Sequence, residues 1–391
     1  MESLTIRNIG PIKFVDLQDI RRFNVFIGES GSGKSTIMKV LAMMRWIYKM
    51  ACVRTYCKNS GIQTPFRFRA DSILGDNGLR PFFDHDSEVV YKNGSYSIIY
   101  RGNKLIFPKK NVAREELSLQ KIAYISDKRI LIPDLASGNV SLRHNMFYLD
   151  ETYLNYQKAL DAIPTADVPY LGVKMAVRKT TGGARVFVSA MDGNHNFENL
   201  PLPSASSGLQ SSVALHMITR YFSHYYNIVE AMNSTIVRFL AAGDNLSKFS
   251  ASFNVGDFPN QRISLHLEEP ELSLFPSNQW GLMKYLVTEC LSAERARMDL
   301  TMATHSPYIL TALNIMMLAY TASHADPAKY DESGLTLPMI APEDVCAWSV
   351  VEGKCESLLN SELGMIDGTH LDGISDDYEQ IITILNDIVY V

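Results

Sequence analysis

Residues 28–36 read Gly-Glu-Ser-Gly-Ser-Gly-Lys-Ser-Thr and match the P-loop pattern G-x-x-x-x-G-K-[ST]. The apolar run 23–27 before the loop predicts a buried strand. Apolar residues at helical spacing after it, at 37, 38, 40, 41 and 44, predict a helix to about residue 52. A strand, a glycine-rich loop and a helix in this order place phosphate groups at a helix N-terminus. The alternative is a glycine-rich turn that binds nothing, and the flanking strand and helix count against it.

Each residue type in the loop has a chemical reason. Glycines permit backbone angles and close approaches that a Cβ would block, so that backbone N–H groups can surround the phosphates. Lys34 is expected to reach the β- and γ-phosphates, and Ser35 to offer its hydroxyl to Mg²⁺. The candidate nucleotide-binding residues of the loop are Gly28, Glu29, Ser30, Gly31, Ser32, Gly33, Lys34, Ser35 and Thr36.

Composition excludes several classes of protein. With 391 residues, 46% hydrophobic and 20% charged, the chain can form a large core or two lobes. Its net charge of −5 gives no support for nucleic-acid binding, which stays an open alternative. Five cysteines without a C-x-x-C pair predict reduced thiols in a cytoplasmic protein. We expect no signal peptide and no membrane span, because the start lacks an apolar core and no apolar run reaches 18 residues.

Hydrophobic periodicity and turn residues predict an α/β protein. Runs at 88–91, 96–100 and 105–107, separated by Asn-Gly and Gly-Asn pairs, predict a three-stranded antiparallel meander. Further strands are expected at 122–125, 263–267, 300–303 and 345–351. Helices are expected over most of 140–160 and 208–243 and near 375–389.

Two acidic residues follow the predicted strand 263–267. An apolar strand can deliver one acid to a nucleotide's Mg²⁺, while the next acid polarises the attacking water. Glu268 is the candidate metal ligand and Glu269 the candidate catalytic base. His305 follows the next predicted strand and could contact the γ-phosphate or the attacking water. The alternative for this histidine is an ordinary, hydrogen-bonded polar group.

A serine-rich segment, 204–212, precedes the predicted helix from 208. Small hydroxyls and a glycine at a helix start can form an anion site from backbone N–H groups and the helix dipole. The alternative is simple capping of that helix by Ser206 or Ser207.

In this order, the motifs resemble those of an ABC-type ATPase. The similarity is greatest to the branch of the overcoming-lysogenisation-defect ATPases and the recombination and chromosome-maintenance ATPases. Segments 6–12, 124–129 and 271–276 also resemble parts of that branch. The resemblance implies ATP and Mg²⁺ as ligands and His305 as the switch histidine. It also implies that Ser206, Ser207 and Gly208 form a signature that meets the γ-phosphate held by a partner chain's P-loop.

This sequence departs from the family pattern in several places. The signature reads Ala-Ser-Ser-Gly-Leu rather than Leu-Ser-Gly-Gly-Gln, and Glu268 stands where aspartate is commoner. The glutamine of the family's Q-loop is not placed, with Gln120 as a weak candidate. No sustained heptads indicate a coiled coil, unlike the chromosome-maintenance members.

By this resemblance we expect an α/β ABC-type ATPase with a mixed-sheet nucleotide lobe, residues 1–135 and 255–391, and a helical signature lobe, 136–254. Two chains would hold ATP head to tail. About 80 residues follow His305, too few for the nuclease usually attached in this family. The chain therefore resembles the sensor subunit of bacterial anti-phage systems, including the PARIS type, which controls a separate toxic nuclease. The alternatives are a DNA-maintenance ATPase that clamps DNA ends and an ATP-gated scaffold with little turnover.

Overall fold

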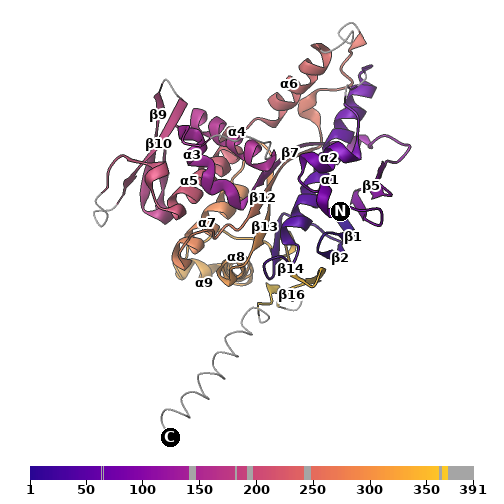
Figure 1. Ribbon diagram of the computed structural model, residues 1–391. Helices are drawn as coiled ribbons and strands as arrows, with labels where there is room; N and C mark the ends of the chain where they lie inside the picture. Colours follow the sequence, from indigo (N-terminus) through magenta and orange to yellow (C-terminus); the bar gives the residue numbers. More distant parts are fainter. Residues whose placement is uncertain are drawn as a thin grey trace.

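A large mixed β-sheet organises the molecule in a computed structural model that describes residues 1–62, 64, 66–140, 147–180, 183–191, 197–241, 248–360 and 363–368 (Figure 1). Within these residues the sheet has eleven strands in the order β6-β5-β4-β1-β2-β15-β14-β3-β13-β12-β7. The expected α/β class and mixed sheet are confirmed. The helix expected near 375–389 lies outside the described residues.

The middle and one side of the sheet are mainly parallel. Its parallel strands are β3 (Phe23–Ile27), β7 (Ser118–Ile125), β12 (Asn260–Glu268), β13 (Arg297–Thr304) and β14 (Val345–Val351). Strand β13 pairs in parallel with both β3 and β12, and β12 pairs in parallel with β7. These strands are almost wholly buried, as their continuous apolar runs predict. Their carboxyl ends therefore meet at one edge of the sheet.

The other side of the sheet is antiparallel. It consists of β1 (Glu2–Ile9), β2 (Ile12–Leu17), β4 (Glu88–Asn93), β5 (Tyr96–Arg101) and β6 (Lys104–Ile106), while β15 (Lys354–Ser357) links β2 to β14. The predicted meander is confirmed as β4, β5 and β6, and β4 joins it to β1. The meander is therefore part of the large sheet.

Helix α1 (Lys34–Asn59) contacts both sides of the sheet and is buried around most of its circumference. The ring of Tyr48 packs against Tyr91 and Tyr96 of the antiparallel side. The guanidinium of Arg45 donates to Glu2 Oε1 at 2.7 Å, and Arg262 from β12 reaches Glu2 Oε2 at 2.8 Å. This buried ion-pair network ties the helix after the P-loop to strands from both sides of the sheet.

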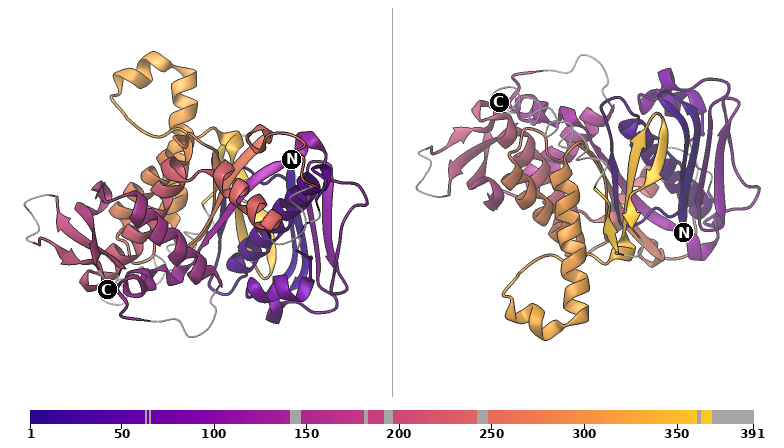
Figure 2. Two further views of the ribbon diagram at one scale, coloured as in Figure 1. Left: turned by 90° about the horizontal axis from the view of Figure 1, so that it is seen from above. Right: turned by 90° about the horizontal axis from the view of Figure 1, so that it is seen from below.

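Residues 126–140, 147–180, 183–191 and 197–225 form most of a second lobe, seen beside the sheet in Figures 1 and 2. Its main helices are α3 (Ile132–Ser137), α4 (Phe147–Ala162) and α5 (Ser207–Arg220). Helix α6 (Ile228–Ala241) instead packs on β7 of the large sheet and lies apart from these helices in Figure 1. The lobe also contains a four-stranded antiparallel sheet of β8 (Thr165–Val168), β9 (Val173–Thr180), β10 (Gly183–Ala190) and β11 (Leu200–Pro201). The expectation of a helical lobe omitted this sheet, which packs against α3 through β10.

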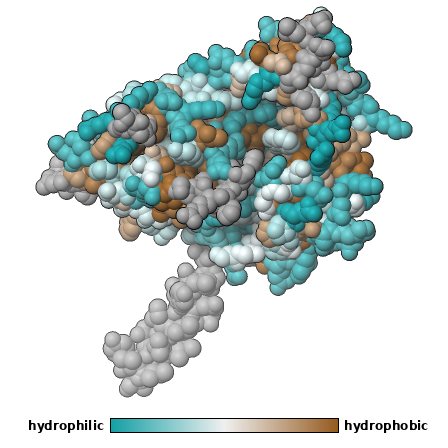
Figure 3. Space-filling model, turned by 45° about the horizontal axis from the view of Figure 1, so that its top comes forward, coloured by the Kyte–Doolittle hydropathy of each residue, from teal (hydrophilic) through white to brown (hydrophobic). Residues whose placement is uncertain are grey.

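The remaining elements lie outside the large sheet, and the last helix among them projects away from it in Figure 2. They are α2 (Ala70–Asp76), α7 (Pro276–Leu291), α8 (Pro307–Ala325), α9 (Pro327–Glu332) and the short strands β16 (Leu359–Asn360) and β17 (Met365–Ile366). Helix α7 packs on β13 and on α8. On the face shown in Figure 3, hydrophobic residues are interspersed with hydrophilic ones.

Candidate nucleotide-binding site

The P-loop connects β3 to α1, as the sequence predicts. Gly28 and Gly33 have φ angles of 153° and 110°, which side chains rarely allow. A Cβ at Gly28 would lie 2.4 Å from the carbonyl oxygen of Val350, and one at Gly33 would lie 2.3 Å from Ile12 Cδ1. The backbone angle favours glycine at both positions, and the close approach to a backbone oxygen excludes a side chain at Gly28. The loop packs against the end of β14 and the start of β2.

Lys34 folds back over the loop. Its ammonium group donates to the carbonyl oxygens of Gly28 at 2.7 Å and Glu29 at 2.8 Å. Burial lowers the pKa of Lys34 from its ordinary value, while the carboxylates of Glu269 and Glu271 act in the opposite direction. A cation held over a concave loop of N–H groups suits the phosphates of a nucleotide.

The strand ends bring the predicted acids and histidine to the P-loop. Because β3, β13 and β12 run parallel and adjacent, Glu268 at the end of β12 and His305 just after β13 reach the same edge as the loop. One cavity of about 370 Å³ results, and its lining is Pro11, Ser30, Gly31, Gly33, Lys34, Ser35, Thr36, Phe82, Glu268, Glu269, Ala303 and His305. Of the loop residues predicted to bind nucleotide, Gly28, Glu29 and Ser32 do not line this cavity.

Glu268 is buried and held by three groups. The hydroxyl of Tyr124 donates to its Oε1 at 2.6 Å, and the backbone N–H of Asp127 donates to its Oε2 at 3.4 Å. The ammonium group of Lys39, five residues after the P-loop lysine on α1, lies 3.9 Å from Oε1. These contacts come from α1 and from the end of β7, so the orientation of the carboxylate is set by two elements.

Glu269 adopts an unusual backbone conformation, with φ at 45°. Its N–H donates to the carbonyl oxygen of Ala303 at 2.8 Å. The buried guanidinium of Arg129 donates to the carbonyl oxygens of Glu268, at 2.7 Å, and of Glu269. Burial lowers the pKa of Arg129 to about 10, against the pull of the nearby carboxylates. Arg129 thus fixes the turn that presents the Glu269 carboxylate to the cavity.

His305 and Glu269 lie side by side in the lining of the cavity, with 3.8 Å between His305 Nε2 and Glu269 Oε1. The backbone N–H of His305 donates to Glu271 Oε1 at 2.8 Å. Burial raises the pKa of Glu269 above its ordinary value, partly offset by His305. A carboxylate with a raised pKa beside a histidine is suited to accept a proton at neutral pH.

The donor atoms at this edge fit Mg²⁺. The Ser35 hydroxyl and the Glu268 carboxylate are hard oxygen donors that line the same cavity. Mg²⁺ commonly takes only one or two protein ligands, with substrate phosphates and water completing its shell. No cluster of three or more His, Cys, Asp or Glu side chains suited to a metal occurs among the described residues. A two-ligand Mg²⁺ site is consistent with this.

The predicted signature residues lie elsewhere. Ser206 is the N-cap of α5, and its Oγ accepts from the N–H of Leu209 at 3.5 Å, so the capping alternative describes this side chain. Ser207 is exposed, and Gly208 is buried against residue 273, where an added Cβ would lie 2.6 Å from the Ser273 carbonyl oxygen. Within one chain, none of the three lines the P-loop cavity.

Several residues at this site were not predicted from the sequence. Lys39 and Phe82 had no motif to indicate them, and Tyr124 had been noted only as part of a resembling segment. Gln120 lies inside β7, where its amide donates to the Ser118 hydroxyl at 3.2 Å, and it does not line the cavity. The end of β7 instead brings Asp127 beside Glu268.

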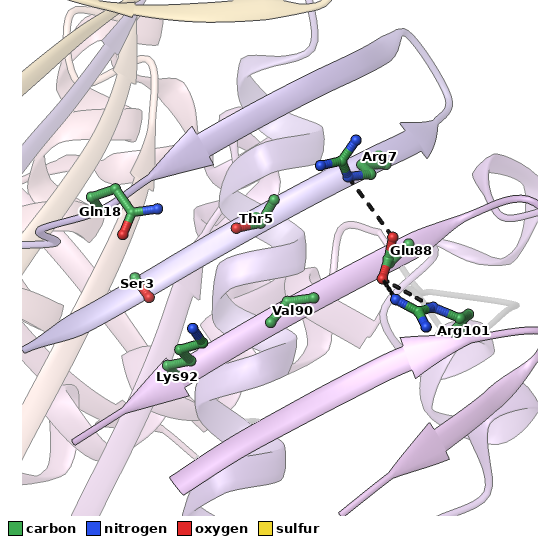
Figure 4. A pocket seen from close by; sticks show the side chains of 8 residues that line it. All are labelled: Ser3, Thr5, Arg7, Gln18, Glu88, Val90, Lys92 and Arg101. Carbon is green, nitrogen blue, oxygen red and sulfur yellow. Dashed lines mark hydrogen bonds and ion pairs between the residues drawn. The ribbon is translucent and has the colours of Figure 1, made fainter. Parts of the chain in front are cut away.

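A second hollow, of about 360 Å³, lies on the outer face of the antiparallel strands (Figure 4). Its side chains come from β1, β4 and β5 and from Gln18. Glu88 pairs with Arg101 and lies 3.8 Å from Arg7 Nε, so its carboxylate is already matched by two cations. This hollow lacks the convergence of strand ends that the P-loop cavity has.

Comparisons with known proteins give only distant similarities. No protein-family model matches the chain, and no curated protein matches it. Among solved structures, the chain is similar to an SMC head bound to the C-winged helix domain of ScpA, at 12% identity and a TM-score of 0.37, covering 93% of this chain and 99% of that one. It is also similar to the SMC head domain from Thermotoga maritima, at 11% identity and a TM-score of 0.37, covering 91% and 97%.

A further similarity is to a dimeric ATP-binding cassette in a post-hydrolysis state bound to ADP and Pi. It has 10% identity and a TM-score of 0.28, covering 90% of this chain and 96% of that one. At TM-scores below 0.5 these likenesses assign neither a family nor a function, which have to come from the residues of the site.

No helix among the described residues is both long and apolar enough to cross a membrane.

Proposed function

We propose that the chain is an ABC-type ATPase that binds ATP with Mg²⁺ in the P-loop cavity and hydrolyses it. One observation carries this proposal: Lys34, the adjacent Glu268 and Glu269, and His305, from three separate segments, line a single cavity at the carboxyl ends of parallel strands. Ligands of α/β proteins bind at such strand ends. A glycine-rich turn that binds nothing would have no reason to share a cavity with two acids and a histidine from distant segments.

The residues have distinct roles in this proposal. Lys34 and the loop N–H groups bind the β- and γ-phosphates, and Ser35 and Glu268 hold Mg²⁺, which neutralises phosphate charge. Glu269 accepts a proton from the water that attacks the γ-phosphorus, while the bond from that phosphorus to the β–γ bridging oxygen breaks. His305 lies beside Glu269, where it can contact the γ-phosphate or the attacking water.

We further propose that two chains share each ATP head to tail. Ser207 is exposed at the N-terminus of the 14-residue helix α5, outside its own chain's cavity. A helix N-terminus with small hydroxyls suits the γ-phosphate held by a second copy. ATP would then join two chains, and hydrolysis would weaken their association.

For the biological role, we propose that ATP-dependent association senses a trigger and controls a separate effector, such as a toxic nuclease, in bacterial anti-phage defence. The support is the resemblance of the motifs to sensor ATPases of that kind. The neighbouring genes provide a test, because this role expects a toxin or nuclease gene beside this one. A repair nuclease gene there would instead favour DNA maintenance.

The ATPase proposal is tested by titration calorimetry with Lys34→Ala. Loss of the ammonium group should weaken Mg²⁺-ATP binding at least tenfold, about 1.4 kcal/mol or more. Lys58→Ala, in the last turn of the same helix, is the control and should bind normally. Wild-type protein should also release phosphate from ATP. Unchanged affinity of Lys34→Ala for Mg²⁺-ATP would show that the P-loop is not part of the binding site.

A further inference from the structure

A further cavity, of about 190 Å³, lies where α1, β7, α4 and the end of α2 meet. No residue of the P-loop, the acid pair or the signature lines it. Much of its lining is aliphatic or aromatic, from Ala42, Trp46, Ile73, Ile122, Tyr124 and Tyr148. A mostly apolar cavity that also holds a few polar groups is typical of a site for a small molecule.

One cation in this cavity has no counter-ion. Lys49 of α1 is partly buried and lines the cavity. In the part of the chain that the structure describes, its ammonium group forms no hydrogen bond or ion pair. Lys121 is already paired, because its ammonium group donates to Glu151 Oε1 at 2.6 Å. The other carboxylate of the lining, Asp76, is exposed, so solvent screens its charge. A partly buried charge without a partner is costly, so Lys49 favours an anion in the cavity.

The charges that act on Lys49 come from β7 and α4. Burial lowers the pKa of Lys49 to about 8, Lys121 acts in the same direction, and Glu151 opposes both. Tyr124 and Tyr148 stay uncharged, because burial raises the pKa of each phenol above its ordinary value. The cavity therefore combines one uncompensated positive charge with aromatic and aliphatic walls.

The cavity also adjoins a group that orients Glu268. Tyr124 lines it, and the Tyr124 hydroxyl donates to Glu268 Oε1 at 2.6 Å. The ring of Tyr148 packs on the ring of Tyr124, with centroids 4.2 Å apart, and its hydroxyl donates to Asn77 Oδ1 at 2.7 Å. A molecule that lies against these two rings would act on the Glu268 carboxylate without entering the P-loop cavity.

We propose that this cavity is a regulatory site for a small carboxylate with an apolar or aromatic body. The carboxylate pairs with Lys49, and the body lies against Trp46 and the tyrosine rings. One uncompensated cation matches one negative charge, which favours a carboxylate over a phosphate group that carries nearly two. The regulatory part rests on the proposed ATPase function, because the ligand acts through Tyr124 on the proposed Mg²⁺ ligand. The binding site itself does not depend on that function.

Fluorescence titration without nucleotide tests the binding site, with benzoate as the probe and benzamide as its uncharged counterpart. Because Trp46 lines the cavity, benzoate should change its fluorescence saturably, with a Kd of about 1 mM, and Trp46→Phe should lack this signal. Benzamide should bind at least about tenfold more weakly. Lys49→Gln should weaken benzoate about tenfold, whereas Lys49→Arg should retain most of the affinity. Lys58→Gln, at the exposed end of the same helix, is the matched control.

Two further measurements sharpen the test. As pH rises through about 8, Lys49 loses its proton, so benzoate affinity should fall, and Lys49→Arg should remove this dependence. In the ATPase assay, saturating benzoate should change the kcat of the wild type by about twofold or more and leave that of Lys49→Gln unchanged. Denaturant unfolding should show Lys49→Gln to be as stable as the wild type, because Lys49 has no partner to lose.

The outcomes separate this proposal from the ATPase proposal. Absence of a saturable signal with benzoate, equal binding of benzoate and benzamide, or unchanged benzoate affinity in Lys49→Gln would each overturn the carboxylate site. Benzoate binding without any change in kcat would refute the regulatory role alone. A wild type that hydrolyses no ATP in the absence of benzoate would overturn the ATPase proposal and the regulatory role with it, while the fluorescence titration would still decide whether the cavity binds a carboxylate.

Discussion

The P-loop cavity is assembled from residues of a single chain, whereas the N-terminus of α5 faces no such site within its own chain. The cavity gathers the loop, two carboxylates and a histidine from one chain. Ser207, at the start of α5, is exposed and does not line its own chain's cavity. Under the proposed function, one chain binds a nucleotide in its cavity, and the start of α5 acts only on a nucleotide held by a second chain.

The two regions are nevertheless packed together within the chain. Gly208 lies against the carbonyl oxygen of Ser273, and the Ser211 hydroxyl donates to the carbonyl oxygen of Leu272 at 3.2 Å. Residues 272–273 follow closely after Glu269, whose carbonyl is held by Arg129. The start of α5 therefore rests on the segment that carries the proposed catalytic base.

The largest effect is expected on the turnover of Glu269→Gln, a substitution that changes only the P-loop cavity. The amide keeps the shape of the side chain but cannot accept the water proton, so turnover should fall about 10²-fold or more. ATP affinity should survive, because Lys34, Ser35 and Glu268 remain. Phosphate release and calorimetry measure the two effects, with Glu294→Gln on an exposed turn as control. Normal turnover would exclude Glu269 as the base.

Gly208→Ala tests the packing between the two regions. The new methyl group would lie 2.6 Å from the Ser273 carbonyl oxygen, so the backbone must move, at a cost of about 1–2 kcal/mol in the free energy of unfolding. Gly75→Ala in α2 meets no atom within 4 Å and should instead stabilise by about 0.5–1 kcal/mol. Denaturant unfolding compares them, and equal stability of both variants would contradict the close contact.

A smaller effect is expected from pH. The base acts as a carboxylate, so the rate falls as pH drops through its pKa and Glu269 becomes protonated. Because burial raises this pKa above 4.5, the acid limb of the kcat profile should begin above that value. ATP affinity should change less over the same range. An acid limb that persists unaltered in the residual activity of Glu269→Gln would assign it to another group.

The sequence allowed much of the sheet to be predicted. Strands β3, β12 and β13 are short apolar runs next to motifs, and the meander is marked by its turn pairs, so local signals suffice. The four-stranded sheet of the second lobe was missed, although buried Val173, Met175, Val186 and Val188 alternate with other residues. Its joining to helices depends on contacts between distant segments, which periodicity does not reveal.

The same division holds for the site. The P-loop, the acid pair and His305 could be proposed as site residues because each chemistry requires a particular residue type at a particular spacing. The groups around them could not be found in this way. The Tyr124 hydroxyl donates to Glu268, which is 144 positions away in the sequence. The N–H of Gly10 donates to the carbonyl oxygen of Phe82, which lies in a turn far along the chain. Such partners are selected by tertiary packing and have no local pattern.

The most direct test of sharing between chains mixes two inactive variants. Ser207→Arg should place a bulky cation where the γ-phosphate held by the partner chain must lie. Lys34→Ala should prevent ATP from binding in the cavity of its own chain. A mixed head-to-tail dimer has one site that carries both substitutions and one site that carries neither. ATP hydrolysis should therefore return on mixing, up to half of the wild-type rate per dimer if the two sites act independently. Native mass spectrometry should verify that mixed dimers form. Absence of any recovered hydrolysis in verified mixed dimers would contradict independent composite sites shared by two chains.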